Sequence, residues 1–170
     1  MNNEPLSWES DKKWSDKFLP EIKQIIGEYL VTEPPMEEDA KHNTDLIVLG
    51  FNSIRVGCRI RKYKYYPQYP NEFTIRSERP VNGTKTELTK IIEGWGDYFF
   101  YGFSDEEERH ILYWRIISLN AFRLWFNRKL VENKGELPGK PKENKDSSSN
   151  FLAFDVSQMP PGIIFKEKEL

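Results

Sequence analysis

Apolar residues recur with helical spacing near the start of the sequence. Between Trp14 and Leu30 they are three or four residues apart, which predicts an amphipathic helix. Pro20 lies inside this stretch and indicates either a break or the point at which the helix restarts. Residues 32–43 contain two prolines and several acidic side chains, and this composition predicts a loop.

Two strands are expected after this loop. Thr44–Leu49 is a short, nearly continuous apolar run that ends at Gly50, which is typical of a buried central strand. From Ile54 to Arg61 apolar and polar residues alternate, so one face of the strand would be apolar, with Cys58 buried on it. The other face would carry arginines, and Gly57 would leave a gap there that a backbone could approach.

The next elements are a tyrosine-rich connection, a strand and a helix. Residues 62–70 are rich in tyrosine and proline, and Glu72–Arg76 predicts a third strand that pairs with the Ile54–Arg61 strand. Thr84 is followed three residues later by Glu87, a spacing typical of a capping box. We therefore expect a helix over residues 85–93 that stops at Gly94.

The rest of the sequence predicts further strands, a linker and a tail. Asp97–Phe103 predicts a buried strand, and Ser104 with Glu107 repeats the capping signature. The following apolar block fits one long helix, or a strand over 113–119 and then a helix from Asn120, and the second arrangement is favoured. Residues 131–150 predict a flexible linker and residues 151–170 an apolar tail that docks on the rest.

These elements indicate an α/β fold in which a mixed central sheet is flanked by helices, formed by residues 1–130. A length of 170 residues and a hydrophobic content of 38% suffice for one core, and no apolar run is long enough to span a membrane. The polar start lacks the features of a secretory signal, so a cytoplasmic location is expected. One cysteine and two histidines exclude an internal disulfide and a Cys- or His-rich metal site, which leaves carboxylates as the only metal ligands.

Charge is distributed unevenly along the chain, although the net charge is only −2. Residues 1–45 contain 5 basic and 11 acidic side chains, whereas residues 54–90 contain 9 basic and 3 acidic ones. A basic middle segment of this kind is compatible with a polyanionic ligand, and the acidic amino-terminal part is a candidate surface for a protein partner.

No glycine-rich phosphate loop, nucleophile elbow or zinc spacing occurs. The order of elements over residues 14–126 nevertheless resembles the PD-(D/E)XK nuclease superfamily, especially small phage- and archaeal-type resolvase or restriction-like domains. A helix precedes a strand that opens with Asp45, and a second and third strand are followed by a helix and a strand over TELTKIIEGWGDYFFYGF. The resemblance implies a restriction-endonuclease-like fold.

The resemblance also implies a Mg²⁺ site, in which two acids hold the metal and a lysine supports the attacking water. Asp45 corresponds to the first acid, and the acid-x-lysine triplet falls on Arg59-Ile60-Arg61, so Arg61 would replace the lysine. Arg59 occupies the position of the second acid, and a guanidinium cannot ligate a cation. Either the second ligand has moved to Glu72 or Glu87, or metal catalysis has been lost.

Each of these residues also has a structural interpretation. Asp45 is equally compatible with simply opening a strand, and Glu87 with closing a capping box. Tyrosines in residues 62–70 either stack on bases beside the lysines or pack on the domain. The basic side chains either form a solvated face or contact phosphates, and those proposed for phosphate contact are Arg59, Arg61, Arg76, Arg79, Lys85 and Lys90.

The first hypothesis is therefore a nucleic-acid-binding protein with a nuclease-like fold. If it cleaves, Asp45 with Glu72 or Glu87 would hold Mg²⁺, and Arg61 would stabilise charge on the phosphate. The second hypothesis is a phage-type protein-interaction module, an inhibitor or assembly factor, that contacts a partner through the acidic amino-terminal part or the carboxy-terminal tail.

Overall fold

A computed structural model of the chain describes residues 13–32, 47–48, 54–78, 85–143 and 149–168. The chain divides into two compact units, and the boundary between residues 6–54 and the larger unit falls at Arg55. None of the helices in the described ranges is long and apolar enough to cross a membrane.

In the smaller unit, residues 13–16 are helical and a turn at residues 17–18 separates them from α2 (Leu19–Leu30). Pro20 is in the first turn of α2, where its missing N–H is tolerated, so it marks the restart of the helix. Strand β1 (Val31–Thr32) pairs antiparallel with β2 (Ile47–Val48) in a separate two-stranded sheet. The prediction of a central strand over 44–49 is therefore wrong for its described residues, and Asp45 lies outside them.

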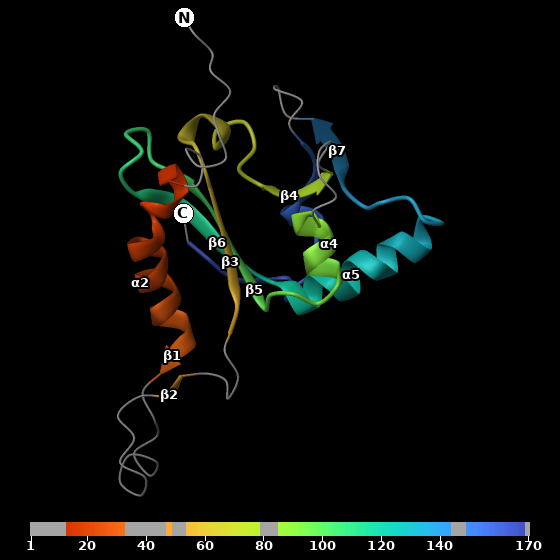
Figure 1. Cartoon of the computed structure of the whole chain (residues 1–170), viewed down its shortest axis with the longest axis horizontal. Coiled ribbons are helices and arrows are strands. Elements are labelled where there is room, and N and C mark those ends of the chain that lie inside the picture. The colour runs from red at the N-terminus through yellow and green to blue at the C-terminus, as the bar shows by residue number, and fades with distance from the viewer. Residues whose placement is uncertain (1–12, 33–46, 49–53, 79–84, 144–148, 169–170) are drawn as a thin grey trace, which may run out of the picture. The chain divides into compact units, whose positions relative to one another are not determined.

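The larger unit contains two sheets, which Figure 1 shows together with the helices. The four-stranded sheet has the order β3-β5-β6-β9, with β3 (Val56–Arg61), β5 (Tyr98–Ser104), β6 (Ile111–Ser118) and β9 (Ile164–Glu167). Because β3 and β5 are parallel and the other pairs are antiparallel, this sheet is mixed, as predicted.

The three-stranded sheet has the order β4-β8-β7, with β4 (Glu72–Glu78), β8 (Asn150–Asp155) and β7 (Lys140–Glu143), and both pairs are antiparallel. The predicted pairing of the Ile54–Arg61 strand with the Glu72–Arg76 strand is therefore wrong. β3 pairs with β5, whereas β4 pairs with a strand from the end of the sequence.

Two helices and two short 3₁₀ turns connect these strands. The favoured division of the apolar block into a strand and a helix is confirmed by β6 and by α5 (Leu119–Glu132), whose amino terminus is capped by the Ser118 hydroxyl. Helix α4 (Glu87–Ile92) is shorter than expected, and its cap is Thr86, whose hydroxyl accepts the Thr89 N–H at 3.2 Å. The 3₁₀ turns are η1 (Tyr63–Tyr65) and η2 (Val156–Gln158).

The capping signature at Ser104 does not start a helix. Ser104 is the last residue of β5, and residues 105–110 form the turn of a β5–β6 hairpin. Asp105 stabilises this turn by accepting the Arg109 N–H at 2.6 Å. The local pattern predicts a helix, but the pairing of two apolar strands decides the conformation.

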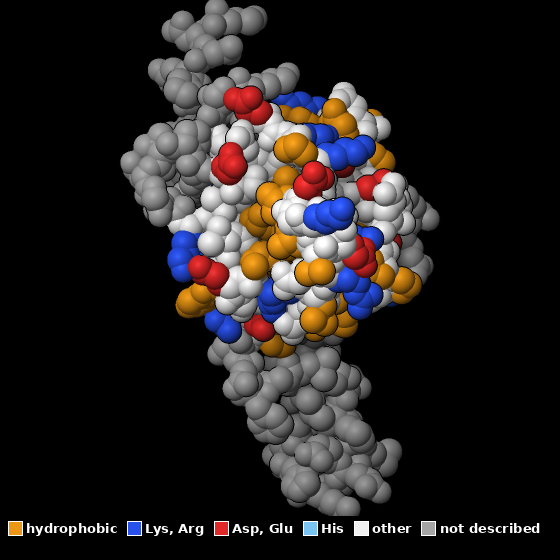
Figure 2. Space-filling model, turned by 90° about the vertical axis from the view of Figure 1, so that its right-hand side faces the viewer, with side chains coloured by type: hydrophobic (Ala, Val, Ile, Leu, Met, Phe, Trp, Pro, Cys, Tyr) orange, Lys and Arg blue, Asp and Glu red, His pale blue; other side chains and the backbone are white. Residues whose placement is uncertain are grey.

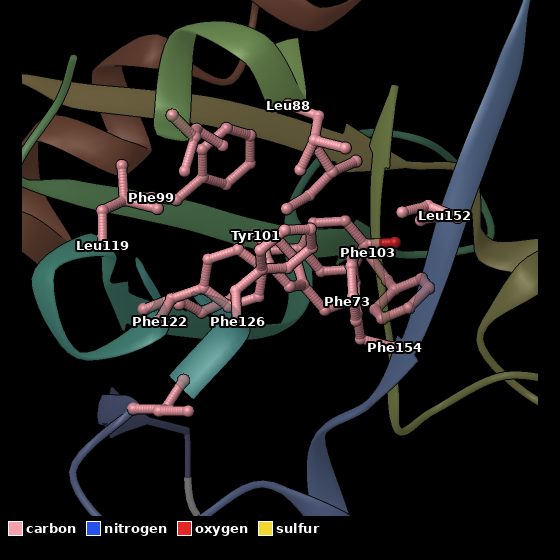
Figure 3. Close-up of a cluster of buried hydrophobic side chains, with 14 of the residues drawn as sticks. Phe73, Leu88, Phe99, Tyr101, Phe103, Leu119, Phe122, Phe126, Leu152 and Phe154 are labelled. Carbon is pink, nitrogen blue, oxygen red and sulfur yellow. The ribbon is translucent and has the colours of Figure 1, made fainter. Parts of the chain in front are cut away.

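An aromatic core lies between the two sheets and α5. Phe73 of β4 is fully buried, and its ring centroid is 5.3 Å from that of Tyr101 in β5 and 5.7 Å from that of Phe122 in α5. Phe154 of β8 contacts both Phe73 and Phe122, at 6.1 and 5.3 Å (Figure 3). Edge-to-face geometry dominates these contacts, as aromatic quadrupoles favour.

The predicted linker and tail are part of this folded unit. Residues 131–132 end α5, and residues 140–143 form β7, so the prediction of a flexible linker over 131–150 is wrong for these residues. The tail supplies β8, the middle strand of the three-stranded sheet, and β9. Residues 144–148 lie outside the described part of the chain.

If the carboxy-terminal segment belongs to the core, Phe154→Ala should cost as much stability as Phe73→Ala. Truncating a buried phenylalanine should lower the free energy of unfolding by about 3–5 kcal/mol in each case. Phe165→Ala is the matched control, because Phe165 lies in the same segment but is 44% exposed. Phe165→Ala should lower the free energy of unfolding by only about 1 kcal/mol. Denaturant unfolding measures all three, and a small loss for Phe154→Ala would contradict this assignment.

Candidate functional site

The arginine face of β3 is turned toward the core side of the four-stranded sheet. In the β3–β5 register, Gly57, Arg59 and Arg61 are opposite the core residues Phe99, Tyr101 and Phe103. The predicted alternation is correct in period, but the arginine face is half-buried, whereas Cys58 on the other face is exposed. A Cβ at Gly57 would lie 2.8 Å from the Phe99 ring, so that ring fills the gap expected for a ligand backbone.

Arg59 and Glu87 together bind the free edge of β4. Arg59 Nη2 donates to Glu87 Oε2 at 2.7 Å, and Arg59 Nη1 donates to the Thr74 carbonyl at 2.9 Å. The same Glu87 oxygen accepts the Arg76 N–H at 3.1 Å. These β4 groups point away from β8, so the ion pair occupies hydrogen-bonding positions that a further strand would otherwise fill.

This arrangement changes the predicted roles of both residues. Arg59 is held by two acceptors at hydrogen-bonding distance, so it ties the two sheets together instead of presenting a free phosphate-binding group. Glu87 begins α4, but it is not the reciprocal partner in a capping box, because Thr86 is the cap. The predicted capping residue Thr84 lies outside the described residues.

Arg61 lies in a second cluster, which we call the Arg61 cluster and define as Arg61, Tyr65, Tyr69, Glu72 and Lys142. The Arg61 guanidinium carbon is 4.4 Å from the Tyr65 ring centroid and 6.0 Å from that of Tyr69. Lys142 Nζ is 4.3 Å from the Tyr69 ring centroid and donates a hydrogen bond to Glu72 Oε1. The Arg61 cluster contains residues from β3, from the connection that follows it, and from β4 and β7.

The hydrogen bonding of this cluster is incomplete. Arg61 Nη1 is 3.3 Å from the Tyr101 hydroxyl and 3.6 Å from Glu72 Oε2, which is an ion-pair distance but too long for a hydrogen bond. Glu72 Oε2 is buried and has no hydrogen-bond partner among the described residues. The cations are thus held mainly by aromatic rings and by one carboxylate.

Two more lysines extend the positive charge around this cluster. Lys64 is exposed, and its Nζ is 5.2 Å from the Tyr65 ring centroid. Lys62 forms an ion pair with Glu108 at 3.2 Å. Tyr66 packs on Phe103 and Tyr113, and Tyr65 also packs against the hydrophobic core in addition to contacting the cations.

The remaining predicted phosphate contacts are dispersed. Lys85 and Lys90 are exposed, and Lys85 pairs with Glu93 at 2.7 Å. Arg76 contributes its backbone N–H to Glu87, and Arg79 lies outside the described residues. Figure 2 shows lysine and arginine side chains interspersed with acidic ones around hydrophobic side chains on one face, which differs from a continuous basic surface.

Each of the two predicted metal ligands that the structure describes already pairs with a basic side chain. Glu72 accepts from Lys142 and Glu87 from Arg59, so a metal ion would have to replace these contacts. Across the described ranges, no group of three or more His, Cys, Asp or Glu side chains is arranged to hold a metal ion. The third candidate ligand, Asp45, lies outside those ranges.

A buried arginine on β6 was not anticipated from the sequence. The Arg115 side chain is 2% exposed, and its Nη2 donates to the Pro70 carbonyl at 2.9 Å and to the Tyr113 hydroxyl at 3.0 Å. Glu167 of β9 lies 3.6 Å from its Nε and accepts from the Tyr113 hydroxyl. Burial, together with the hydrogen bond to Glu167, raises the pKa of Tyr113.

The role of Glu87 at the β4 edge can be tested by removing its carboxylate. Glu87→Ala leaves the Arg76 N–H and the half-buried Arg59 without their acceptor, so the free energy of unfolding should fall by about 2–3 kcal/mol. Glu93→Ala is the control, because its pair with Lys85 is on the surface and should contribute less than ~1 kcal/mol. Equal losses for the two variants in denaturant titrations would show that the β4 edge does not depend on Glu87.

Comparison with known proteins identifies no relative, because no family model, curated protein or solved structure matches this chain.

Proposed function

We propose that this protein binds nucleic acid, in single-stranded form, through the Arg61 cluster and Lys64. The observation that carries the proposal is that three cations, Arg61, Lys64 and Lys142, lie on two tyrosine rings. Two of them, Arg61 and Lys142, also share one carboxylate, Glu72. Cations supply contacts to phosphates, and tyrosine rings offer faces on which unpaired bases stack.

The state of Arg61 supports this role better than the state of Arg59. Arg59 is engaged by a carboxylate and a carbonyl at hydrogen-bonding distance, whereas Arg61 has one long hydrogen bond and one long ion pair. A guanidinium that rests on aromatic rings keeps N–H groups for a phosphate, and arginine is well suited to bidentate phosphate contacts.

The proposed architecture for this binding is nuclease-like. Its support is the mixed four-stranded sheet in which β3, the strand that carries Arg59-Ile60-Arg61, is parallel to β5. Helix α4 lies between these strands in the sequence, as the resemblance to the PD-(D/E)XK superfamily implies. Arg61 would then neutralise phosphate charge at the position that the superfamily gives to a lysine.

The proposal concerns binding, without Mg²⁺-dependent cleavage. Ligation by Glu72 or Glu87 would cost the contacts that each makes with a cation. We therefore expect that incubation of labelled DNA and RNA with Mg²⁺ or Mn²⁺ yields no cleavage, analysed on denaturing gels. Cleavage that disappears in an Asp45→Ala variant would contradict this and would establish Asp45 as a catalytic residue.

A protein-interaction module is the second candidate, and exposed apolar residues on α5 favour it. Leu124 is 74% exposed and Val131 is 80% exposed, and a separation of seven residues puts both on one side of the helix. The carboxy-terminal tail, by contrast, is used within the two sheets. If the protein does not bind nucleic acid at any salt concentration, including low salt, this candidate is favoured.

Fluorescence anisotropy with a labelled single-stranded oligonucleotide tests the proposal. Affinity should fall steeply as salt rises, because counterions are released from the strand. Lys64→Ala should weaken binding and reduce the salt slope by about 0.7, the contribution of one phosphate contact on a single strand. Tyr65→Ala should weaken binding by about tenfold or more, because base stacking contributes ~1–3 kcal/mol.

The matched control is Lys129→Ala, which removes a lysine from α5 that pairs with Glu132 at 2.8 Å. This variant has the same net charge as Lys64→Ala but lacks contact with the Arg61 cluster. If both lysine variants bind equally well, the cluster is not the binding surface. If duplex DNA binds as tightly as the single strand, base stacking is not the mode of recognition.

A further inference from the structure

Glu72 interacts with the two cations of the Arg61 cluster as an acidic ligand would. One of its oxygens accepts from Lys142 Nζ, and the other lies 3.6 Å from Arg61 Nη1. Arg61 and Lys142 come from different sheets, β3 and β7, and 70 residues separate Lys142 from Glu72. The fold therefore brings two distant cations to one carboxylate.

This contact is not optimised for stability. Glu72 Oε2 is buried without a hydrogen bond, although an arginine is beside it. A buried acceptor that lacks a donor is unfavourable compared with a solvated one, and a direct bond to Arg61 would remove that cost. The Arg59–Glu87 pair, with a distance of 2.7 Å, shows that the same protein can form such a bond where the role is structural.

We propose that Arg61 and Lys142 form a phosphate subsite, and that Glu72 occupies it in the free protein as an internal competitor. This inference rests on the proposed function and adds a regulatory feature to it. A phosphate of the bound strand replaces Glu72 at Lys142 Nζ and supplies acceptors to the Arg61 N–H groups that Glu72 leaves unbonded. Glu72 thus lowers the affinity for nucleic acid and makes binding depend on an exchange of anions.

Glu72→Gln tests this, because the amide keeps the size and the acceptor oxygen but removes the competing charge. Its affinity for the single-stranded oligonucleotide should rise by about fivefold, the scale of one partly exposed ion pair. The salt slope should also become steeper by about 0.7, for one additional phosphate contact. Glu132→Gln is the control, because it makes the same change in net charge next to Lys129 on α5.

A double-mutant cycle separates competition at Lys142 from a general charge effect. If Glu72 masks Lys142, the gain from Glu72→Gln should disappear in a Lys142→Ala background. A gain that persists in that background, or an equal gain in Glu132→Gln, would overturn the inference. Melting curves of each variant test whether the protein is fully folded at the temperature of the binding experiment. If Glu72→Gln is unfolded, Glu72→Asp, which keeps the charge, replaces it.

Glu72→Asp should then also bind more tightly than the wild type, because the shorter side chain withdraws the carboxylate from Lys142. Unchanged affinity would overturn the inference. Failure of the proposed function gives a different result, namely no binding by the wild-type protein or by any Glu72 variant at low salt. If the wild type and Glu72→Gln bind equally well, the function stands and only the internal competition is refuted.

Discussion

The larger unit depends on the separation of β4 from β3, its predecessor in the sequence. β3 stays in the four-stranded sheet, whereas β4 crosses to the three-stranded sheet and pairs with β8. The interface between the sheets must then bury apolar side chains and also satisfy the polar groups along the β4 edge. Phe73 and its aromatic neighbours meet the first requirement, and Arg59 with Glu87 meets the second.

Neighbouring arginines on β3 consequently have different roles. Arg59 and Arg61 are two residues apart on one face of the strand, yet only Arg59 has acceptors at short distance. Arg61 is surrounded by tyrosine rings, to which a guanidinium is attracted without using its N–H groups. One structural ion pair therefore links β3 to β4, while the neighbouring guanidinium on the same strand contacts mainly aromatic rings.

The sequence predicted the elements better than their partners. The strand predicted over 97–103 and the favoured division into a strand over 113–119 and a helix from Asn120 follow from local pattern, and β5, β6 and α5 confirm them within one or two residues. At Pro20 the sequence left a break and a restart of the helix open, and the structure shows the restart. Strand pairing is not encoded locally, and nothing in residues 72–76 indicates that β8 is their partner. A lysine- and proline-containing segment such as 140–143 has the composition of a linker, and only its pairing with β8 makes it a strand.

The candidate site, like the fold, was predicted only in part. Arg61 and the tyrosines of residues 62–70 were recognised as candidates, because basic and aromatic residues alternate there. Lys142 was not, because its relevance arises from the packing of β7 against a distant part of the chain. Arg59 was predicted to contact phosphates, with a solvated face as the alternative, since alternation identifies two faces without indicating which one meets a second sheet. The nuclease resemblance and the role of Asp45 remain predictions.

The pairing of β4 with β8 also affects how the protein can form on the ribosome. Glu78 and its partner Asn150 are 72 residues apart in the chain. At elongation rates of about 5–20 residues per second, β4 is translated several seconds before β8. During that interval the apolar side chains of β4, Phe73 and Ile75, and its unpaired edge are exposed together. A nascent chain of this design would benefit from chaperones that bind exposed apolar segments, and a ribosome stalled between the two strands would present an aggregation-prone intermediate.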